Sequence, residues 1–589
     1  MTHDRLSSVV ERAARAYPKL DRGTLEARDR GGGLVTAAVA HAPAVAAPRA
    51  YRAEAGEAAV FFDGLPVDRL GDLAAHDAEV LLERWPELPE RLEGVFSAIR
   101  VDGRSGEVEC LLDVLGMAQV YVVRDGAAWA LSNNVEVLRL VSEVAEPDPL
   151  GLSSMLTLGW VAGDRTLLKG VEVLPGGHLH RLGARITARP LLSPATVVPR
   201  ASPPPRPARE LAAAMTRTMA ALPRSGGPLS CGLTAGRDSR VIVALALAAG
   251  LDVDYFTSGS PDHVDVRRAA ELAGRLGLRH RVIAPEVPRD PAQWARQTAA
   301  FSAQSDGIAS LWDVGDWAEH QVPLDRLGVK LWGPGGEIGR SARIGVGIPF
   351  MANAPGLRRS WRAQRWVLEQ KTACWGGLVT PEGAAETRRY LDRYVDERRR
   401  EGWRAREVLE SYYAFERVKH WAASGVRRAS EATDIFAPFI SRDYIEYCYA
   451  LTPAQRYAEA AHHRLLGALA PELRDQPPFD APWKPQRPRA ATVHATVTGA
   501  GWALRRMPGA ARRSPPRPPS FAARWYAAGR PLHREMATAF PSSPVWDFVD
   551  RRRYEQLVAA EPGPHVEGLC RALTALWYLH GRHEAPATT

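Results

Sequence analysis

Long hydrophobic runs are missing from this chain of 589 residues. It contains no stretch of about 18 apolar residues, and its first residues lack the apolar core of a secretory signal. We therefore expect neither a membrane span nor export. Cysteine is also scarce, and the five cysteines lie far apart, without the close pairs of zinc sites or redox motifs: Cys110, Cys231, Cys374, Cys448 and Cys570. Reduced thiols and a cytoplasmic location are the expectation.

Acidic residues are absent between Ala481 and Arg534, where lysines and arginines recur. This span accounts for the formal net charge of +9. Its proline–arginine clusters predict an irregular, solvated segment. The alternative is a binding surface for an acidic peptide, nucleic acid or anionic surface, which salt-dependent binding would favour. We do not expect nucleic acid to be the main partner.

The composition, 46% hydrophobic and 24% charged, is that of a globular protein, and the length suggests two to four domains. A proline-rich connector at 198–208 separates two halves. Before it, alternating segments at 94–101 and 119–123 predict strands, so this half is expected to be β-rich. No internal repeat is evident.

After the connector, strand and helix patterns alternate, which predicts a parallel sheet covered by helices. The expected segments are a strand at 228–233, a helix at 238–249, a strand at 252–257 and a helix at 265–276. From 404 to about 466 the pattern is mostly helical and indicates a cap or side bundle. Residues 487–589 form a basic segment followed by a helical extension.

The first strand-to-helix turn, Leu229-Ser-Cys-Gly-Leu-Thr-Ala-Gly-Arg-Asp-Ser-Arg240, carries most of the functional information. Small side chains at Thr234 and Gly236 let backbone N–H groups at the helix start approach an anion, which the helix dipole also attracts. Asp238 and Ser239 then stand where a magnesium ion and phosphate oxygens would lie. The alternative is an ordinary turn, because small residues are common between a strand and a helix.

The segment Thr234-Ala-Gly-Arg-Asp-Ser-Arg240 resembles the Ser-Gly-Gly-x-Asp-Ser-Ser pyrophosphate loop of asparagine synthetase B-type enzymes, which split ATP to AMP and pyrophosphate. It is not a Walker loop, since no Gly-Lys-Ser/Thr closes it. Ala235, Arg237 and Arg240 depart from the usual residues. The resemblance implies an α/β protein whose residues 209–486 form a parallel-sheet, PP-loop synthetase domain that uses ATP and Mg²⁺.

The first half resembles the glutamine amidotransferase domain of the same family, a β-rich αββα unit assigned here to residues 1–197. The landmarks are Leu112-Asp-Val-Leu-Gly116 with Tyr121, Leu131-Ser-Asn-Asn134, and the stretch 166–177. Glutamine-hydrolysing members carry a nucleophilic cysteine at position 2, where this chain has Thr2. We therefore expect no ammonia supply from this domain and a structural or partner-binding role instead.

A second glycine-rich turn, Val329-Lys-Leu-Trp-Gly-Pro-Gly-Gly-Glu-Ile-Gly-Arg340, resembles the family's Gly-Glu-Gly-Ala-Asp-Glu segment. Glu337 falls on its metal-binding acid, so Asp238 and Glu337 are expected to share Mg²⁺. A glycine turn with a solvated Glu337 is the alternative. Pro334 stands where relatives carry a residue that assists catalysis, and a proline cannot move a proton.

Other site residues follow from the same resemblance. Pro438 and Phe439 match a further family segment that here lacks its arginine, and Asp265 is expected to be structural. Lys484 is the candidate for the cation that neutralises negative charge during the reaction. The predicted catalytic residues are Lys484 and Glu337, and the predicted nucleotide-binding residues are Leu233, Thr234, Gly236, Asp238, Ser239, Thr257, Ser258, Gly333 and Gly335.

Together these features predict an ATP-dependent ligase that adenylates a carboxylate on a small molecule or peptide and joins it to an amine. Macrolactam formation on a precursor peptide, with a protease as partner, is the favoured version, after lasso-peptide cyclases and β-lactam synthetases of the family. The alternatives are an ammonia-dependent asparagine synthetase, a tRNA-modifying enzyme, and a nucleotide-binding protein without catalysis. The tRNA-modifying alternative is weakened by the absence of a sulfur-handling cysteine pair.

Overall fold

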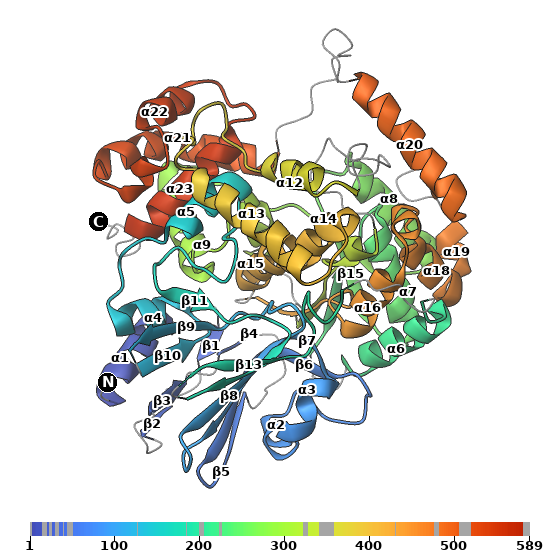
Figure 1. Cartoon of the computed structure of the whole chain (residues 1–589), viewed down its shortest axis with the longest axis horizontal. Coiled ribbons are helices and arrows are strands. Elements are labelled where there is room, and N and C mark those ends of the chain that lie inside the picture. Colours follow the sequence, from blue (N-terminus) through green and yellow to red (C-terminus); the bar gives the residue numbers. More distant parts are fainter. Residues whose placement is uncertain are drawn as a thin grey trace.

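The protein is a mixed α/β protein with antiparallel sheets in its first half and a parallel sheet in its second half (Figure 1). The computed structural model describes residues 3–14, 20–22, 26–29, 35–38, 41–43, 51–126, 128–183, 185–198, 205–222, 227–321, 328–340, 359–429, 432–475, 482–505 and 520–580. Thr2 and connector residues 199–204 lie outside this part of the chain.

The first half contains a six-stranded antiparallel sheet in the order β13-β12-β8-β7-β6-β5 and a three-stranded sheet in the order β10-β9-β11. Short pairs β1–β4 and β2–β3 precede them. The strands are β1 (Leu20–Arg22), β2 (Glu26–Asp29), β3 (Val35–Ala38), β4 (His41–Pro43), β5 (Arg52–Ala55), β6 (Ala58–Asp68), β7 (Leu92–Asp102), β8 (Glu107–Leu112), β9 (Tyr121–Asp125), β10 (Ala128–Ser132), β11 (Val171–Val173), β12 (His178–Leu182) and β13 (Thr187–Pro190).

The strands predicted at 94–101 and 119–123 are confirmed as β7 and β9. Helices flank the sheets at both ends of this half: α1 (His3–Ala14), α2 (Ala78–Glu83), α3 (Leu88–Arg91), α4 (Val135–Ser142) and α5 (Pro149–Leu158). Helix α5 begins where the Asp148 carboxylate accepts the N–H of Gly151, and it ends at Gly159 in the left-handed conformation.

The second half is built on a five-stranded sheet in the order β16-β15-β14-β17-β18, and all its pairings are parallel. Its strands are β14 (Leu229–Gly232), β15 (Val253–Ser258), β16 (His280–Ile283), β17 (Val329–Leu331) and β18 (Asp434–Phe436). The predicted parallel sheet is confirmed. The edge strand β18 lies inside the region predicted to be mostly helical, and its three residues were too few to show a periodicity.

Helices account for most of the remaining second half. They are α6 (Ala208–Ala220), α7 (Arg237–Ala248), α8 (Val264–Leu276), α9 (Pro291–Gln304), α10 (Val314–Gln321), α12 (Trp361–Glu369), α13 (Ala385–Arg400), α14 (Val408–Tyr412), α15 (Lys419–Ala429), α16 (Arg442–Ala450), α17 (Pro453–Tyr457), α18 (Ala460–Leu469) and α19 (Pro471–Asp475). The two helices predicted after the first two strands are confirmed as α7 and α8. Helix α18 packs against both α6 and α7.

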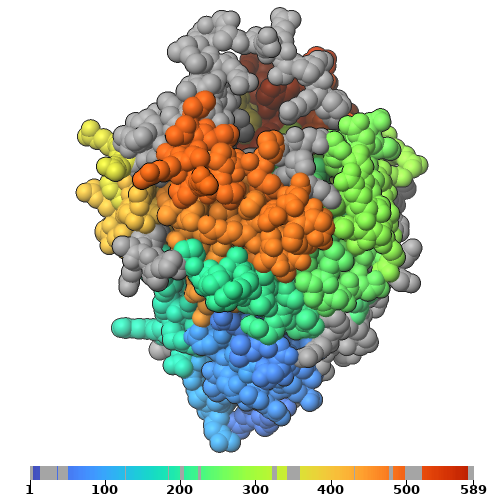
Figure 2. Space-filling model, turned by 90° about the vertical axis from the view of Figure 1, so that its right-hand side faces the viewer, coloured from blue at the N-terminus to red at the C-terminus, as the bar shows by residue number. Residues whose placement is uncertain are grey.

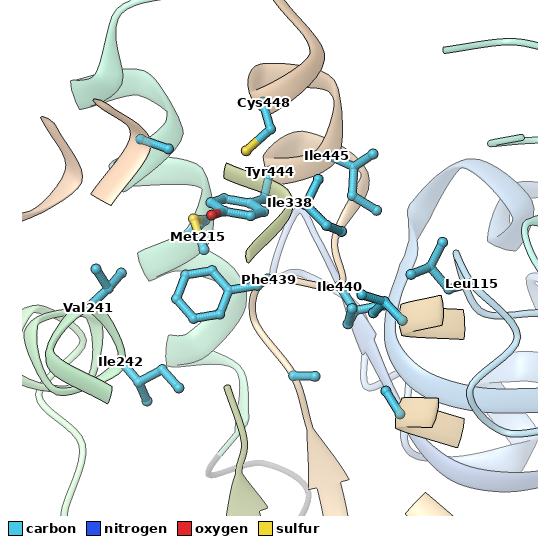
Figure 3. Packing of buried hydrophobic residues seen from close by; sticks show 14 of the residues in the cluster. Leu115, Met215, Val241, Ile242, Ile338, Phe439, Ile440, Tyr444, Ile445 and Cys448 are labelled. Atoms are coloured by element: carbon cyan, nitrogen blue, oxygen red, sulfur yellow. The ribbon is translucent and has the colours of Figure 1, made fainter. Parts of the chain in front are cut away.

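The two halves share one hydrophobic core. Figure 3 shows Phe439 beside Met215 and Tyr444, with Ile242 of α7 on one side and Leu115 of the first half farther along the same packed layer. Phe439 and Tyr444 are fully buried, and their ring centroids lie 4.9 Å apart. The proline-rich connector therefore joins two halves that are packed against each other.

The C-terminal helices α21 (Phe521–Ala539), α22 (Arg551–Ala559) and α23 (Val566–His580) enter a second core, together with α5 and α9. Trp294 of α9 lies 4.9 Å from Trp525 between ring centroids and 6.0 Å from Trp577. Gly529 is required at this contact, because a Cβ there would lie 2.0 Å from the Trp294 ring. The helical extension is thus an integral part of the fold.

Helix α20 (Pro488–Arg505) lies along the outer edge of the molecule (Figure 1). Together with the helices before it, it forms the orange surface in Figure 2, above the blue first half. Val493 and Val497 of α20 are exposed, whereas residues 506–519 of the basic span lie outside the described part of the chain. Among the described helices, none combines the length and the apolar character that crossing a membrane requires.

Candidate functional site

The candidate site lies where the strand order reverses. Strand β14 pairs with β15 on one side and with β17 on the other, so the loops after β14 and β17 leave the same edge of the sheet beside each other. In open parallel sheets the crevice at such a switch point is the usual place for a ligand. These two loops are the two glycine-rich turns of the sequence.

The loop after β14 is closed by its own side chains. Ser239 Oγ lies 3.1 Å from Thr234 Oγ1, and the N–H of Gly236 donates to Thr234 Oγ1 at 3.1 Å. The N–H of Ala235 donates to Asp265 Oδ1 at 3.0 Å. Asp265, expected to be structural, therefore places a carboxylate on an amide that the loop would otherwise offer to an anion.

Asp238 stands in the first turn of α7 and has a partner on each oxygen. His462 of α18 lies with Nε2 2.7 Å from Asp238 Oδ1, and the guanidinium of Arg340 pairs with Oδ2. Burial by itself would raise the pKa of the Asp238 carboxyl. The Arg340 charge and the hydrogen bond from His462 outweigh burial and lower that pKa to about 2. Asp238 is therefore a carboxylate at neutral pH.

The loop after β17 packs directly on Asp238. A Cβ at Gly336 would lie 2.2 Å from Asp238 Oδ1, and one at Gly333 would lie 3.4 Å from the Asp238 Cβ. Gly335 adopts a φ of +88°, which favours glycine. The hydroxyl of Tyr444 in α16 donates to the Gly336 carbonyl at 2.9 Å, so a fully buried side chain anchors this loop.

Glu337 follows in the 3₁₀ turn η4 (Gly336–Gly339), and its Oε1 lies 3.9 Å from the Arg340 guanidinium. The structure thus brings Asp238 and Glu337 together at the guanidinium of Arg340. Three buried polar atoms around it have no hydrogen-bond partner among the described atoms: Glu337 Oε2, Arg340 Nε and His462 Nδ1. Buried polar atoms in folded proteins usually have a partner, so these three atoms are suited to hydrogen-bond a ligand or a water molecule.

Lys484 is held beside the first loop by a second charged group. Its Nζ donates to Glu459 Oε1 at 2.9 Å and to the Tyr457 carbonyl at 3.0 Å. Glu459, which is 1% exposed, also pairs with Arg237 at the start of α7. Burial would raise the pKa of Glu459, but Lys484 and Arg237 lower it, so the carboxylate stays charged between two cations.

The remaining predicted nucleotide-binding residues line the sheet edge. Thr257 is buried, with Oγ1 donating to the Leu233 carbonyl at 2.7 Å and lying 2.8 Å from His280 Nε2. It therefore ties the ends of β14, β15 and β16 together. Ser258, the last residue of β15, is partly exposed.

The donor set does not fit a divalent cation between Asp238 and Glu337 as these residues are arranged. Both oxygens of Asp238 have partners, and Arg340 lies between the two acids. Among the described residues, no group of three or more His, Cys, Asp or Glu side chains could hold a metal ion. The loops themselves fit a nucleotide better, because they meet at the switch point and carry an unpartnered donor, Arg340 Nε.

Among the described residues of the first half, no comparable cluster lies at the sequence landmarks. Asp113 accepts the N–H groups of Leu115, Met117 and Ala118 at 3.1, 3.0 and 2.9 Å, which makes it the organiser of a tight turn. Its pKa is raised to about 6 by burial. Thr2, which stands where glutamine-hydrolysing members of the family carry their cysteine, lies outside the described residues. The five cysteines are all free, as expected.

Sequence reasoning missed Arg340, Glu459 and His462. Arg340 stands at the end of the second glycine-rich turn, so its position was visible but its role was not. No local pattern marks His462 or Glu459, which reach the site only because α18 packs on α7. No protein-family model matches the chain, and comparison with curated proteins gave no match.

Proposed function

We propose that this protein is an ATP-dependent ligase that adenylates a carboxylate and joins it to an amine. One observation carries the proposal. The loops after β14 and β17 lie side by side at the switch point, where Asp238 and Glu337 both contact the guanidinium of Arg340. A parallel sheet with two small-residue loops at this edge is suited to a nucleotide. In this proposal residues 209–486 are the PP-loop synthetase domain and residues 1–197 an amidotransferase-like domain without glutaminase activity.

The proposed reaction has two steps. A carboxylate oxygen attacks the α-phosphorus of ATP, the bond to the bridging oxygen breaks, and pyrophosphate leaves. The amine nitrogen then attacks the acyl carbon, AMP leaves with the bonding electron pair, and the amine loses a proton. Adenylation is needed because a free carboxylate is a poor electrophile. Lys484 would stabilise the negative charge that develops in both steps.

We assign the polyphosphate to Thr234, Gly236 and Ser239 of the first loop, with Gly333 and Gly335 of the second. The adenosine is assigned to the sheet edge at Leu233, Thr257 and Ser258. Mg²⁺ accompanies ATP in solution. The sequence-based assignment of Mg²⁺ to Asp238 and Glu337 is a prediction that the present partners of Asp238, His462 and Arg340, do not favour. The favoured substrate is a peptide that carries both carboxylate and amine, so that the product is a macrolactam.

ATP–pyrophosphate exchange tests the proposal. Purified full-length protein is incubated with ATP, labelled pyrophosphate and a panel of carboxylates that includes aspartate and precursor peptides. Exchange with one class and its loss in Asp238→Ala support the proposal, and exchange that Asp238→Ala leaves unchanged contradicts it. Aspartate-dependent exchange without a peptide would indicate an ammonia-dependent synthetase instead.

A second candidate, nucleotide binding without turnover, is favoured by one observation. Both oxygens of Asp238 already have partners, His462 and Arg340, so this carboxylate offers no unpaired oxygen to a catalytic metal. The same assay separates the candidates. ATP binding measured by calorimetry without exchange on any carboxylate would support the non-catalytic one.

A further inference from the structure

Arg340 occupies the position between the two acids for which the sequence predicted a metal. Its Nη2 pairs with Asp238 Oδ2 and lies 3.9 Å from Glu337 Oε1. Only 12% of the arginine side chain is exposed, against 34% for Glu337. A guanidinium held this way is oriented by two carboxylates and cannot rotate away without separating at least one buried charge from its partner.

The surroundings of Asp238 leave little space for a second cation. Mg²⁺ requires near-octahedral oxygen ligands at about 2.0–2.1 Å. The backbone at Gly336 packs closely on Asp238 Oδ1, because a Cβ added at Gly336 would lie 2.2 Å from that oxygen. His462 Nε2 lies 2.7 Å from the same oxygen. A metal at Asp238 would have to displace both His462 and Arg340.

The guanidinium still has unused hydrogen-bonding capacity. Its contacts with Asp238 and Glu337 both use Nη2, and its buried Nε has no hydrogen-bond partner among the described atoms. An N–H donor of this kind suits an anionic oxygen, and guanidinium groups bind phosphates through two parallel N–H donors. Two other cations nearby, Lys484 and Arg237, both pair with Glu459.

We propose that Arg340 is a built-in cation for the polyphosphate: Asp238 and Glu337 hold its guanidinium, and the guanidinium binds nucleotide phosphates where a divalent cation was expected. This inference rests on the proposed function, because it assumes that the two loops at the switch point bind a polyphosphate. The two acids thereby serve as positioning residues for Arg340. Polyphosphate binding at this site should therefore not require a metal at Asp238 and Glu337.

Calorimetric titration with inorganic pyrophosphate tests the inference on the full chain, once with Mg²⁺ and once with EDTA. The wild-type affinity in EDTA should lie within about threefold of that in Mg²⁺, and Arg340→Gln should weaken it roughly tenfold or more in both media. Arg340→Lys keeps the positive charge but loses the parallel N–H donors of the guanidinium. Its affinity for pyrophosphate should therefore lie between those of the wild type and of Arg340→Gln. Arg268→Gln, which removes an exposed arginine of α8 paired with Glu271, is the matched control.

Glu337→Gln separates the two roles of the acids. If Glu337 positions Arg340, loss of its charge leaves the guanidinium less well oriented, and pyrophosphate should bind about two- to tenfold more weakly in Mg²⁺ and in EDTA alike. If Glu337 binds metal, the variant should lose Mg²⁺-dependent binding. Circular dichroism and thermal unfolding confirm that each variant is folded.

Two results would overturn the inference while leaving the proposed function intact. These are wild-type binding that needs Mg²⁺ by more than about tenfold, and an Arg340→Gln variant that binds pyrophosphate in EDTA as tightly as the wild type does. Absence of pyrophosphate binding and of exchange in both media would contradict the proposed function itself.

Discussion

His462 and Asp238, separated by 224 residues in the chain, form a partly buried hydrogen bond of 2.7 Å between Nε2 and Oδ1. The bond connects α18 to the first turn of α7. The imidazole also packs against Phe439, with 5.7 Å between ring centroids. A residue from the helical region thus fixes the carboxylate that the strand-to-helix loop presents.

His462→Ala should destabilise the protein by roughly 2–4 kcal/mol, because it removes the donor to a partly buried carboxylate and opens a cavity beside Phe439. Urea unfolding followed by circular dichroism measures the change. His463→Ala is the matched control, since the neighbouring ring is only partly buried against Trp483 and its loss should cost less. Equal effects of the two variants would contradict the role given to His462.

Gly336→Ala should destabilise the second loop by roughly 1–3 kcal/mol, because the added Cβ would lie 2.2 Å from Asp238 Oδ1 and must push the loop or the carboxylate away. Gly274→Ala in α8 is the comparison. A Cβ at Gly274 meets nothing within 4 Å, so alanine should be neutral or stabilise by up to about 1 kcal/mol. Thermal unfolding of both variants checks the difference, and a neutral Gly336→Ala would disprove the close packing.

Lys484→Ala should lower kcat for ATP–pyrophosphate exchange roughly 100-fold, with a smaller change in KM, because the lysine is assigned to charge that develops during the reaction. Lys169→Ala, which removes an exposed lysine paired with Glu146, should leave kcat unchanged. A Lys484 variant that retains full kcat would remove this residue from the mechanism.

Stability should fall as the pH rises through the folded-state pKa of Glu93. Burial and the neighbouring Asp443 carboxylate raise that pKa from 4.5 to about 8, against the opposing effect of Arg69 and Arg442. A raised carboxyl pKa means that the folded state holds the proton more tightly, so this contribution is complete below pH 4.5 and is lost as the pH passes 8.

Glu93→Gln should flatten the pH dependence, because glutamine cannot ionise, and should make the protein more stable than wild type above pH 8. Urea midpoints between pH 5 and about 9 measure this. Since Glu93 accepts the Arg442 N–H across the junction of the two halves, an unchanged pH profile would show that the carboxyl ionises without cost there.

The alternation of strand and helix patterns after the connector was enough to predict the parallel sheet, since buried strands and amphipathic helices have different periods. The same alternation predicted that the two glycine-rich loops follow the ends of strands. These loops carry Asp238 and Glu337. The alternation could not assign β18, because a three-residue strand carries no period. The groups that pair with Asp238, Glu337 and Lys484 were equally hidden.

The sequence by itself determined the division into a β-rich first half and an α/β second half, the parallel sheet and the two loops. These features depend on local patterns of small, apolar and charged residues. Only the tertiary structure decided that Arg340 stands between the two acids, that Glu459 holds Lys484, and that the C-terminal helices complete a core with α5 and α9. Such contacts join residues far apart in the chain. Their partners are chosen by packing and charge neutralisation, which no local pattern records.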